Sequence, residues 1–274
     1  MEYLLNYAWI GNKDYYCSEK FRSRSPIPAE FLNNVDQVAQ KLSDITIWIW
    51  CDDAELTRRG KEVLLAFKQR HPNLHLKNLN NVPTYRENPV FEKIQKEPQA
   101  VKIWHKVDLL RLLVLAHVFK TTDVTWAFYS DFDVADPEIH SQRTRLILDK
   151  HSLLLNNSCV TPEETFIENN FMGFHRAISD EITQRFIPET VASFSRNKFS
   201  GWDAFWKCAL EFCAIKKISV GDISFYHPSI RTKGRHKFDT QLLVIGQKPV
   251  ISCAEVLRHM LSKRKTTNSQ SCRV

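Results

Sequence analysis

The first half of the chain alternates strand-like and helix-like segments, and this alternation restricts the fold more than any other feature. Strand-like segments are short and rich in β-branched and aromatic residues, whereas helix-like segments repeat apolar residues every three to four positions. Strands joined through helices run parallel, so the pattern predicts an α/β fold with a mostly parallel central sheet flanked by helices. The predicted strands are 3–10, 45–50, 74–76 and one ending at 131, and the predicted helices are 28–42, 54–70 and 101–119.

After residue 137 the pattern is less regular. We find no internal repeat and no linker, which favours a single domain over residues 1–261 followed by a polar, basic tail at 262–274. In this half the sequence predicts strands at 151–155, 171–174, 217–220 and 241–245, and helices at 178–194, 202–213 and 254–261.

The composition is that of a globular protein, with 43% hydrophobic and 25% charged residues among 274. Seven scattered cysteines without a CxxC pair indicate reduced thiols in a cytosolic setting rather than disulfides or a zinc site. The first residues lack the layout of a signal peptide, and no apolar run is long enough for a membrane span. We therefore expect a cytoplasmic protein.

The net charge of +7 includes two basic clusters, at 231–237 and 263–265. They are either solvated loops or contacts to a nucleotide diphosphate, to an acidic membrane surface at its periphery, or to nucleic acid. Aromatic residues do not alternate with these basic runs, so we expect no nucleic-acid partner.

Two carboxylates, Asp131 and Asp133, end the apolar run that begins at Trp126. Alternate residues of a strand point the same way, so both acids are expected to project side by side at the carboxyl end of the strand. Two such charges repel each other unless a cation lies between them, and a hard divalent ion prefers carboxylate oxygens. A bare Asp-x-Asp more often begins a solvated turn, but the buried strand and the helix before it favour a ligand site at the sheet edge.

The helix predicted at 101–119 is nearly all apolar from Val107 onward, with Asp108, Arg111 and His117 as the main exceptions. Asp108 and Arg111 are three positions apart and share a face, so they can simply pair with each other. Alternatively both line a polar cavity, where Arg111 faces an anionic group and Asp108 accepts hydrogen bonds from hydroxyls.

Four ordered blocks between residues 9 and 175 resemble one family. They are WIG at 9–11, KVDLLR at 106–111, YSDFD at 129–133 and NNFMGFH at 169–175. Together they resemble the DXD sugar-binding region of GT-A glycosyltransferases, close to the Och1-like mannosyltransferases and the clostridial glucosylating toxins. The resemblance implies a GT-A (Rossmann-like nucleotide-sugar) fold and a metal-dependent, retaining transfer of a sugar from a nucleotide-diphosphate sugar to a protein or glycan acceptor. UDP-glucose or UDP-GlcNAc is favoured over GDP-mannose.

The resemblance also implies roles for individual residues. Asp131, Asp133 and Arg111 form the catalytic set, and the two acids hold Mn²⁺ (or Mg²⁺). Trp9 stacks on the base and Tyr129 touches the nucleotide sugar, although both are equally suited to the core. The donor contacts are completed by Asp108, Arg111, Asp131 and Asn169, or its neighbour Asn170.

The chain departs from the family in two places. KTTDVT at 120–125 replaces the usual Gly-Gly before the DXD strand. The third metal ligand is unassigned, with His227, Asn268 and Ser269 as candidates.

Two other functions stay open: a DxD-type haloacid-dehalogenase-like phosphatase, and a non-enzymatic basic domain that binds membrane or nucleic acid. The toxin-like resemblance also suggests an effector secreted into a host cell without a classical signal peptide, or else an enzyme that builds surface polysaccharide.

Overall fold

A seven-stranded sheet forms the centre of the computed structural model, with the strand order β3-β2-β1-β4-β6-β5-β7. The structure describes residues 2–10, 29–87, 103–132, 151–161 and 164–195, together with 27, 134, 139, 145, 148–149, 204–205, 207–209, 211 and 224–225. The strands are β1 (Tyr3–Trp9), β2 (Thr46–Cys51), β3 (Leu74–Asn78), β4 (Trp126–Ser130), β5 (Leu153–Thr161), β6 (Glu164–His175) and β7 (Ser224–Phe225).

Most strand pairs in the described part are parallel, as the alternating pattern predicts. Strand β1 pairs in parallel with both β2 and β4, and β2 pairs in parallel with β3. Strand β6 is antiparallel to its neighbours β4 and β5, while β7 is parallel to β5. The carboxyl ends of β1, β2 and β4 therefore lie at one edge of the sheet, where ligands bind in open α/β folds.

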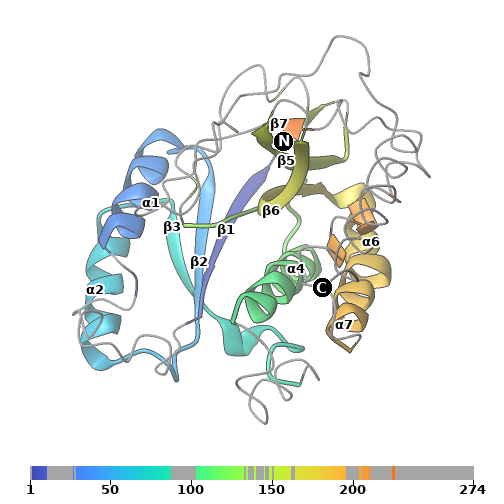
Figure 1. The fold of residues 1–274 in the computed structure, drawn as a ribbon. Coiled ribbons are helices and arrows are strands. Elements are labelled where there is room, and N and C mark those ends of the chain that lie inside the picture. Colours follow the sequence, from blue (N-terminus) through green and yellow to red (C-terminus); the bar gives the residue numbers. More distant parts are fainter. Residues whose placement is uncertain are drawn as a thin grey trace.

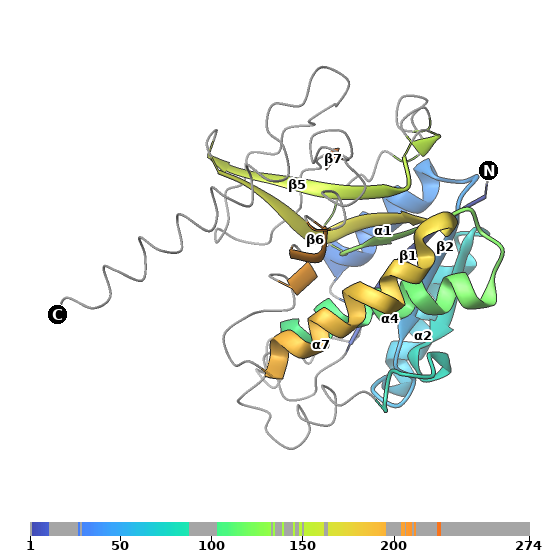
Figure 2. The ribbon, with the colours of Figure 1, turned by 90° about the vertical axis from the view of Figure 1, so that its right-hand side faces the viewer.

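Helices cover both faces of the sheet (Figure 1). On one face lie α1 (Ala29–Lys41) and α2 (Arg58–Gln69), and on the other lies α4 (Ile103–Thr121). The short segments η2 (Leu79–Asn81) and η3 (Arg176–Ile178) connect these layers. Figure 2 shows α7 (Ile187–Ser195) lying over α4, reached through α6 (Ser179–Glu181) and the π-helical turn η4 (Ile182–Phe186).

Helix α4 is apolar on most of its surface because it lies between the sheet and α7. It packs against β1 and β4 on one side and against η4 and α7 on the other. Its residues from Leu109 to Leu115 are all buried. A helix buried on most faces has no water to solvate a charge, so Asp108 and Arg111 need partners within the protein.

Within the described residues the predicted elements agree with the structure, with shifts at their ends. Helix α2 begins at Arg58 rather than 54, because the Thr57 side chain accepts a hydrogen bond from the backbone nitrogen of Gly60 (3.1 Å) and caps the first turn. Strands β5 and β6 are longer than predicted, because they pair with each other along much of their length. The segments predicted at 217–220, 241–245 and 254–261 lie outside the described residues, as does the tail.

Two further sequence-based expectations concern thiols and membrane spans. Cys51 and Cys208 are buried free thiols, and burial raises the pKa of both to about 12, which keeps them protonated and unreactive at neutral pH. No helix in the described part of the chain combines the length and apolar character that crossing a bilayer requires.

Candidate active site at the carboxyl edge of the sheet

Four of the predicted site residues meet at the carboxyl end of β4, and we call Asp108, Arg111, Asp131 and Asn169 the arginine cluster. Asp131 directly follows β4, Asp108 and Arg111 lie on α4, and Asn169 lies on β6. The side chains of Asp108 and Arg111 are 9% and 8% exposed, whereas that of Asp131 is 23% exposed. Asp131 is thus the charged member of the arginine cluster that solvent reaches most easily.

Arg111 holds the cluster together. Its Nη2 donates to Oδ2 of Asp131 over 2.7 Å, and its Nη1 lies 3.4 Å from Oδ1 of Asp108. Nη1 also donates to the backbone oxygen of Asn169 (3.0 Å) and to the side-chain oxygen of the same residue. Burial opposes the charge of Arg111, but the neighbouring Asp131, Tyr129 and Asp108 outweigh it and raise the pKa of the guanidinium. Arg111 is therefore permanently charged.

The structure shows the pairing of Asp108 with Arg111 that the sequence allows. The two residues do pair within α4, but Arg111 makes its shorter contact with Asp131 across to β4. Nε of Arg111 is buried and has no hydrogen-bond partner in the part of the chain that the structure describes. The direct contact of Arg111 with a donor stays a prediction.

A bulge in β6 brings Asn169 into the cluster. Strand β5 pairs Leu155 with Met172 and the next residue, Asn156, with Glu168, so residues 169–171 of β6 have no counterpart on β5. In a strand without a bulge, side chains two positions apart lie on the same face, so the Asn169 side chain would lie with that of Phe171 on the α1 side of the sheet. Instead its side-chain nitrogen donates to Oδ1 of Asp108 on α4 (2.8 Å). Bulges re-aim side chains in this way, and they are common next to active sites.

The same bulge also fixes the backbone of Asp131. Its amide nitrogen donates to the backbone oxygen of Asn170 over 2.7 Å, immediately beyond the last pair of the β4–β6 ladder. The carboxylate of Asp131 is thus held from its backbone by β6 and from its side chain by Arg111. Asn170 itself is buried and contributes a backbone oxygen to the site.

Tyr129 forms the floor of the cluster. Its ring is 1% exposed, and its centroid lies 5.5 Å from the guanidinium carbon of Arg111. Burial, followed by the charge of Asp131, raises the pKa of the Tyr129 phenol well above its usual value. The phenol is therefore neutral at physiological pH, and it lies in the core beneath the acid. The contact of Tyr129 with a nucleotide sugar stays a prediction.

Trp9 lies at the same edge of the sheet but on the opposite face. Its ring packs edge-to-face on Phe132 and Phe31, in the core shared with α1, and it is 9% exposed. Tyr129 belongs to the core on the α4 side. The structure therefore does not bring Trp9 into the arginine cluster, and its role in base stacking stays a prediction.

The second acid of the motif, Asp133, lies outside the described residues, as do His227, Asn268 and Ser269. Within the described residues no group of three or more His, Cys, Asp or Glu side chains is placed to hold a metal ion. The arginine cluster supplies one partly exposed carboxylate, Asp131, which has the oxygen chemistry that Mg²⁺ and Mn²⁺ prefer.

Asp52 is a second buried acid at this edge that our sequence analysis did not identify. It follows β2 as Asp131 follows β4, and it accepts hydrogen bonds from the Asn80 side chain (3.0 Å), the Tyr85 hydroxyl (3.3 Å) and the backbone of Ala54 (2.9 Å). The sequence feature that could have identified Asp52 is its place directly after the strand-like segment 46–51, which matches the place of Asp131 after β4. These contacts attach the chain after β3 to the end of β2.

No family model and no curated protein matches this sequence, but solved structures do. A structure described as a transferase matches with a TM-score of 0.52 and 15% identity over 82% of this chain and 91% of its own. A transferase mutant matches with a TM-score of 0.51 and 14% identity over the same shares of the two chains. Mouse xyloside xylosyltransferase 1, in its apo form, matches at a lower TM-score of 0.48, with 10% identity over 77% of this chain and 82% of that one. At these identities the first two matches establish the α/β fold of this chain, with its mostly parallel sheet flanked by helices.

Proposed function

We propose that this chain is a metal-dependent GT-A glycosyltransferase that transfers a sugar, with retention of configuration, from a nucleotide-diphosphate sugar to a protein or glycan acceptor. The observation that carries the proposal is the arginine cluster at the carboxyl edge of the sheet. It joins Asp108, Arg111, Asp131 and Asn169, which belong to three of the four blocks of the family resemblance. The fold shared with structures described as transferases supports it.

The charge balance of the cluster favours a cation. Arg111 contributes one positive charge, and Asp108 and Asp131 contribute one negative charge each, so the sum is −1. Tyr129 adds no charge because its pKa is raised. We propose that Asp131 and Asp133 hold Mn²⁺ or Mg²⁺ together with the diphosphate of the donor. When bound, this ion supplies Lewis-acid stabilisation of the charge that develops on the departing phosphate.

The residues of the chain then have separate tasks. Arg111 and the backbone of Asn170 orient the Asp131 carboxylate, because they fix it from two directions. Asn169 and Asp108, which are hydrogen-bonded to each other, present polar atoms for the hydroxyls of the transferred sugar. A preorganised polar site of this kind stabilises charge that develops in the transition state. We propose that the acceptor oxygen attacks the anomeric carbon on the face from which the phosphate leaves, and that the departing phosphate takes the proton of the acceptor as the sugar–phosphate bond breaks, so no protein general base is assigned.

The phosphatase alternative is less well supported by the contacts of Asp131. In that mechanism an aspartate is the nucleophile, and its attacking oxygen has to face the phosphorus atom. Here Oδ2 of Asp131 is 2.7 Å from a buried, permanently charged guanidinium, which lowers the nucleophilicity of that carboxylate.

Donor binding is the direct test. The melting temperature of the full chain is measured with UDP-glucose, UDP-GlcNAc and GDP-mannose, each with and without Mn²⁺. We expect one UDP-sugar with Mn²⁺ to raise it, since a ligand that binds the native state stabilises that state. Release of UDP, with water or an added glycan as acceptor, then measures catalysis.

Asp131→Asn is the informative variant, because it removes the charge and keeps the shape. We expect UDP release to fall by about 10²-fold or more, the range found when one group that stabilises the transition state is removed. The matched control is Asp123→Asn, an exposed acid just before β4 that is expected to leave activity unchanged. Activity on a phosphomonoester without any response to nucleotide sugars would instead establish the phosphatase reading.

A further inference from the structure

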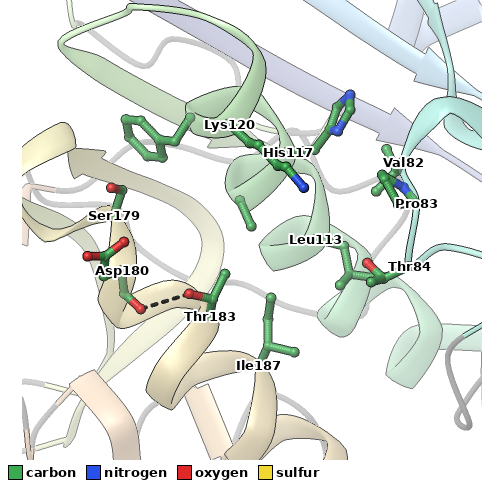
Figure 3. A pocket seen from close by; sticks show the side chains of 12 residues that line it. Val82, Pro83, Thr84, Leu113, His117, Lys120, Ser179, Asp180, Thr183 and Ile187 are labelled. Atoms are coloured by element: carbon green, nitrogen blue, oxygen red, sulfur yellow. Dashed lines mark hydrogen bonds between the residues drawn. The ribbon is translucent and has the colours of Figure 1, made fainter.

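A cavity of about 560 Å³ lies beside the outer half of α4, away from the arginine cluster (Figure 3). Its walls come from α4, from the turn after η2, and from the continuous helical segment formed by α6, η4 and α7. None of the four cluster residues lines it. Lys120, on its rim, is nine positions beyond Arg111, which is about 13 Å along a helix axis. The size is within the range of small-molecule sites.

Two opposite charges face this cavity. Figure 3 shows Lys120 reaching from α4 toward the middle of the cavity, while Asp180 lies on the wall that α6 forms. Neither side chain makes an ion pair or hydrogen bond within the described part of the chain, and they do not pair with each other. The cavity therefore keeps an ammonium group and a carboxylate group apart on different walls.

His117 is the remaining titratable residue among those described around the cavity. Burial, together with the charges of Lys120 and Lys77, lowers the pKa of its imidazole below the ordinary value. His117 is consequently neutral at pH 7, and the described residues that line the cavity carry one positive and one negative charge. A ligand with one charge of each sign can pair with both walls, whereas a ligand with a single charge can pair with only one.

The surface between the two charges is apolar with a hydroxyl border. Leu113 and Ile187 provide the apolar part, and Ser179 and Thr183 provide hydroxyls near Asp180. The hydroxyl of Thr183 is oriented by its hydrogen bond to the backbone oxygen of Asp180 (3.0 Å). An apolar body between two polar ends matches this surface.

We propose that this cavity is a binding site for a zwitterion with an apolar body, namely a short peptide with free amino and carboxyl ends. Its carboxylate binds Lys120, its ammonium group binds Asp180, and its apolar side chain packs on Leu113 and Ile187. A tripeptide spans about 10 Å when extended, and its central side chain supplies the apolar body between its two charged ends. The site is independent of the donor site proposed at the carboxyl edge.

The tripeptide Gly-Leu-Gly is the probe, titrated into the full chain by calorimetry up to about 10 mM, since two exposed ion pairs support no more than millimolar affinity. The acetylated and the amidated forms of the same peptide each lack one charge. We expect the free peptide to bind, and each blocked form to bind about tenfold more weakly. If the free peptide does not bind, or if blocking the ends has no effect, the proposal is wrong.

Exchanging the two charges locates the site. Lys120→Glu and Asp180→Lys are each expected to weaken binding of the free peptide about tenfold, because each leaves two like charges at the cavity. The double variant restores one charge of each sign, so it is expected to recover binding with the peptide reversed. Lys61→Glu, at an exposed position on α2, is the matched control and is expected to bind like the unmodified chain. If both single variants bind the free peptide as tightly as the unmodified chain does, the peptide binds elsewhere and the proposal is overturned.

Discussion

Arg111 and Asp131 are twenty positions apart in the chain, and their side chains meet at 2.7 Å where α4 crosses the end of β4. Both are held by further groups, so the pair is the centre of a network rather than an isolated ion pair. Buried charges of this kind are costly when one partner is lost, because the other remains without solvent.

Arg111→Met therefore tests whether the cluster stabilises the fold. The substitution removes the guanidinium that pairs with Asp108 and Asp131, and we expect the free energy of unfolding to fall by about 3–5 kcal/mol. Urea denaturation followed by circular dichroism measures it. The control is Arg58→Met, since Arg58 is 95% exposed in its pair with Glu62, and exposed pairs contribute about 1 kcal/mol or less. Equal losses in the two variants would contradict a structural role for Arg111.

Removal of divalent ions tests whether the cluster depends on a metal. Because Arg111 already neutralises part of the acid charge, we expect EDTA to leave the melting temperature of the free protein unchanged. In the presence of the donor, EDTA is expected to abolish the stabilisation that the donor produces, since a shared ion is then missing. A melting temperature that falls in EDTA without any donor would show that the fold itself contains a metal.

Tyr129→Phe is expected to change how stability depends on alkaline pH. The pKa of the Tyr129 phenol is raised above 10.0 in the folded state, so its contribution to stability is complete below pH 10 and is lost as the pH rises. Each such group lowers the free energy of unfolding by up to about 1.4 kcal/mol per pH unit in that range. Urea denaturation between about pH 9 and 11 is expected to give a flatter decline for the variant. Identical slopes would show that the phenol ionises in the folded protein as it does in the unfolded chain.

Gly173→Ala tests the packing of β6 against β4. A Cβ atom at residue 173 would lie 2.5 Å from Cδ1 of Phe128, and the Phe128 ring is stacked between Trp126 and Phe171. Because the ring has no space to move, we expect a loss of about 1–3 kcal/mol in the free energy of unfolding. Leu65→Ala, at an exposed position on α2, is the control and is expected to change the free energy of unfolding by no more than about 0.5 kcal/mol. If Gly173→Ala lowers the free energy of unfolding no more than the control does, the backbone or the Phe128 ring moves to accommodate the added Cβ atom.

The parts of the fold that depend on local periodicity were predictable from the sequence. The strand at residues 46–51 consists of β-branched and aromatic residues, and α4 shows the apolar character of a doubly covered helix. The placement of Asp108, Arg111 and Asp131 near one another also followed, because the helix leads directly into the strand. These features are encoded within about 30 consecutive residues, which is the length of a strand–helix unit.

Features that arise from pairing between distant segments were not predictable. The bulge at 169–171 exists only relative to the register of β5, so nothing in the Asn-Asn pair by itself indicates which face Asn169 occupies. The face of Trp9 was likewise undetermined, because it depends on the register of β1 against β2 and β4. Asp52 was missed since its partners, Asn80 and Tyr85, come from a turn without periodicity.

The bulge has a consequence for how this site can be altered. A strand with three unmatched residues cannot slide along its neighbour without breaking the ladder on both sides, so its alignment is locked by the main chain. The side chain at position 169 is therefore presented to α4 whatever its identity. Exchanging that one side chain changes the hydrogen-bonding groups offered to Arg111 and Asp108 while the main chain around it keeps its alignment.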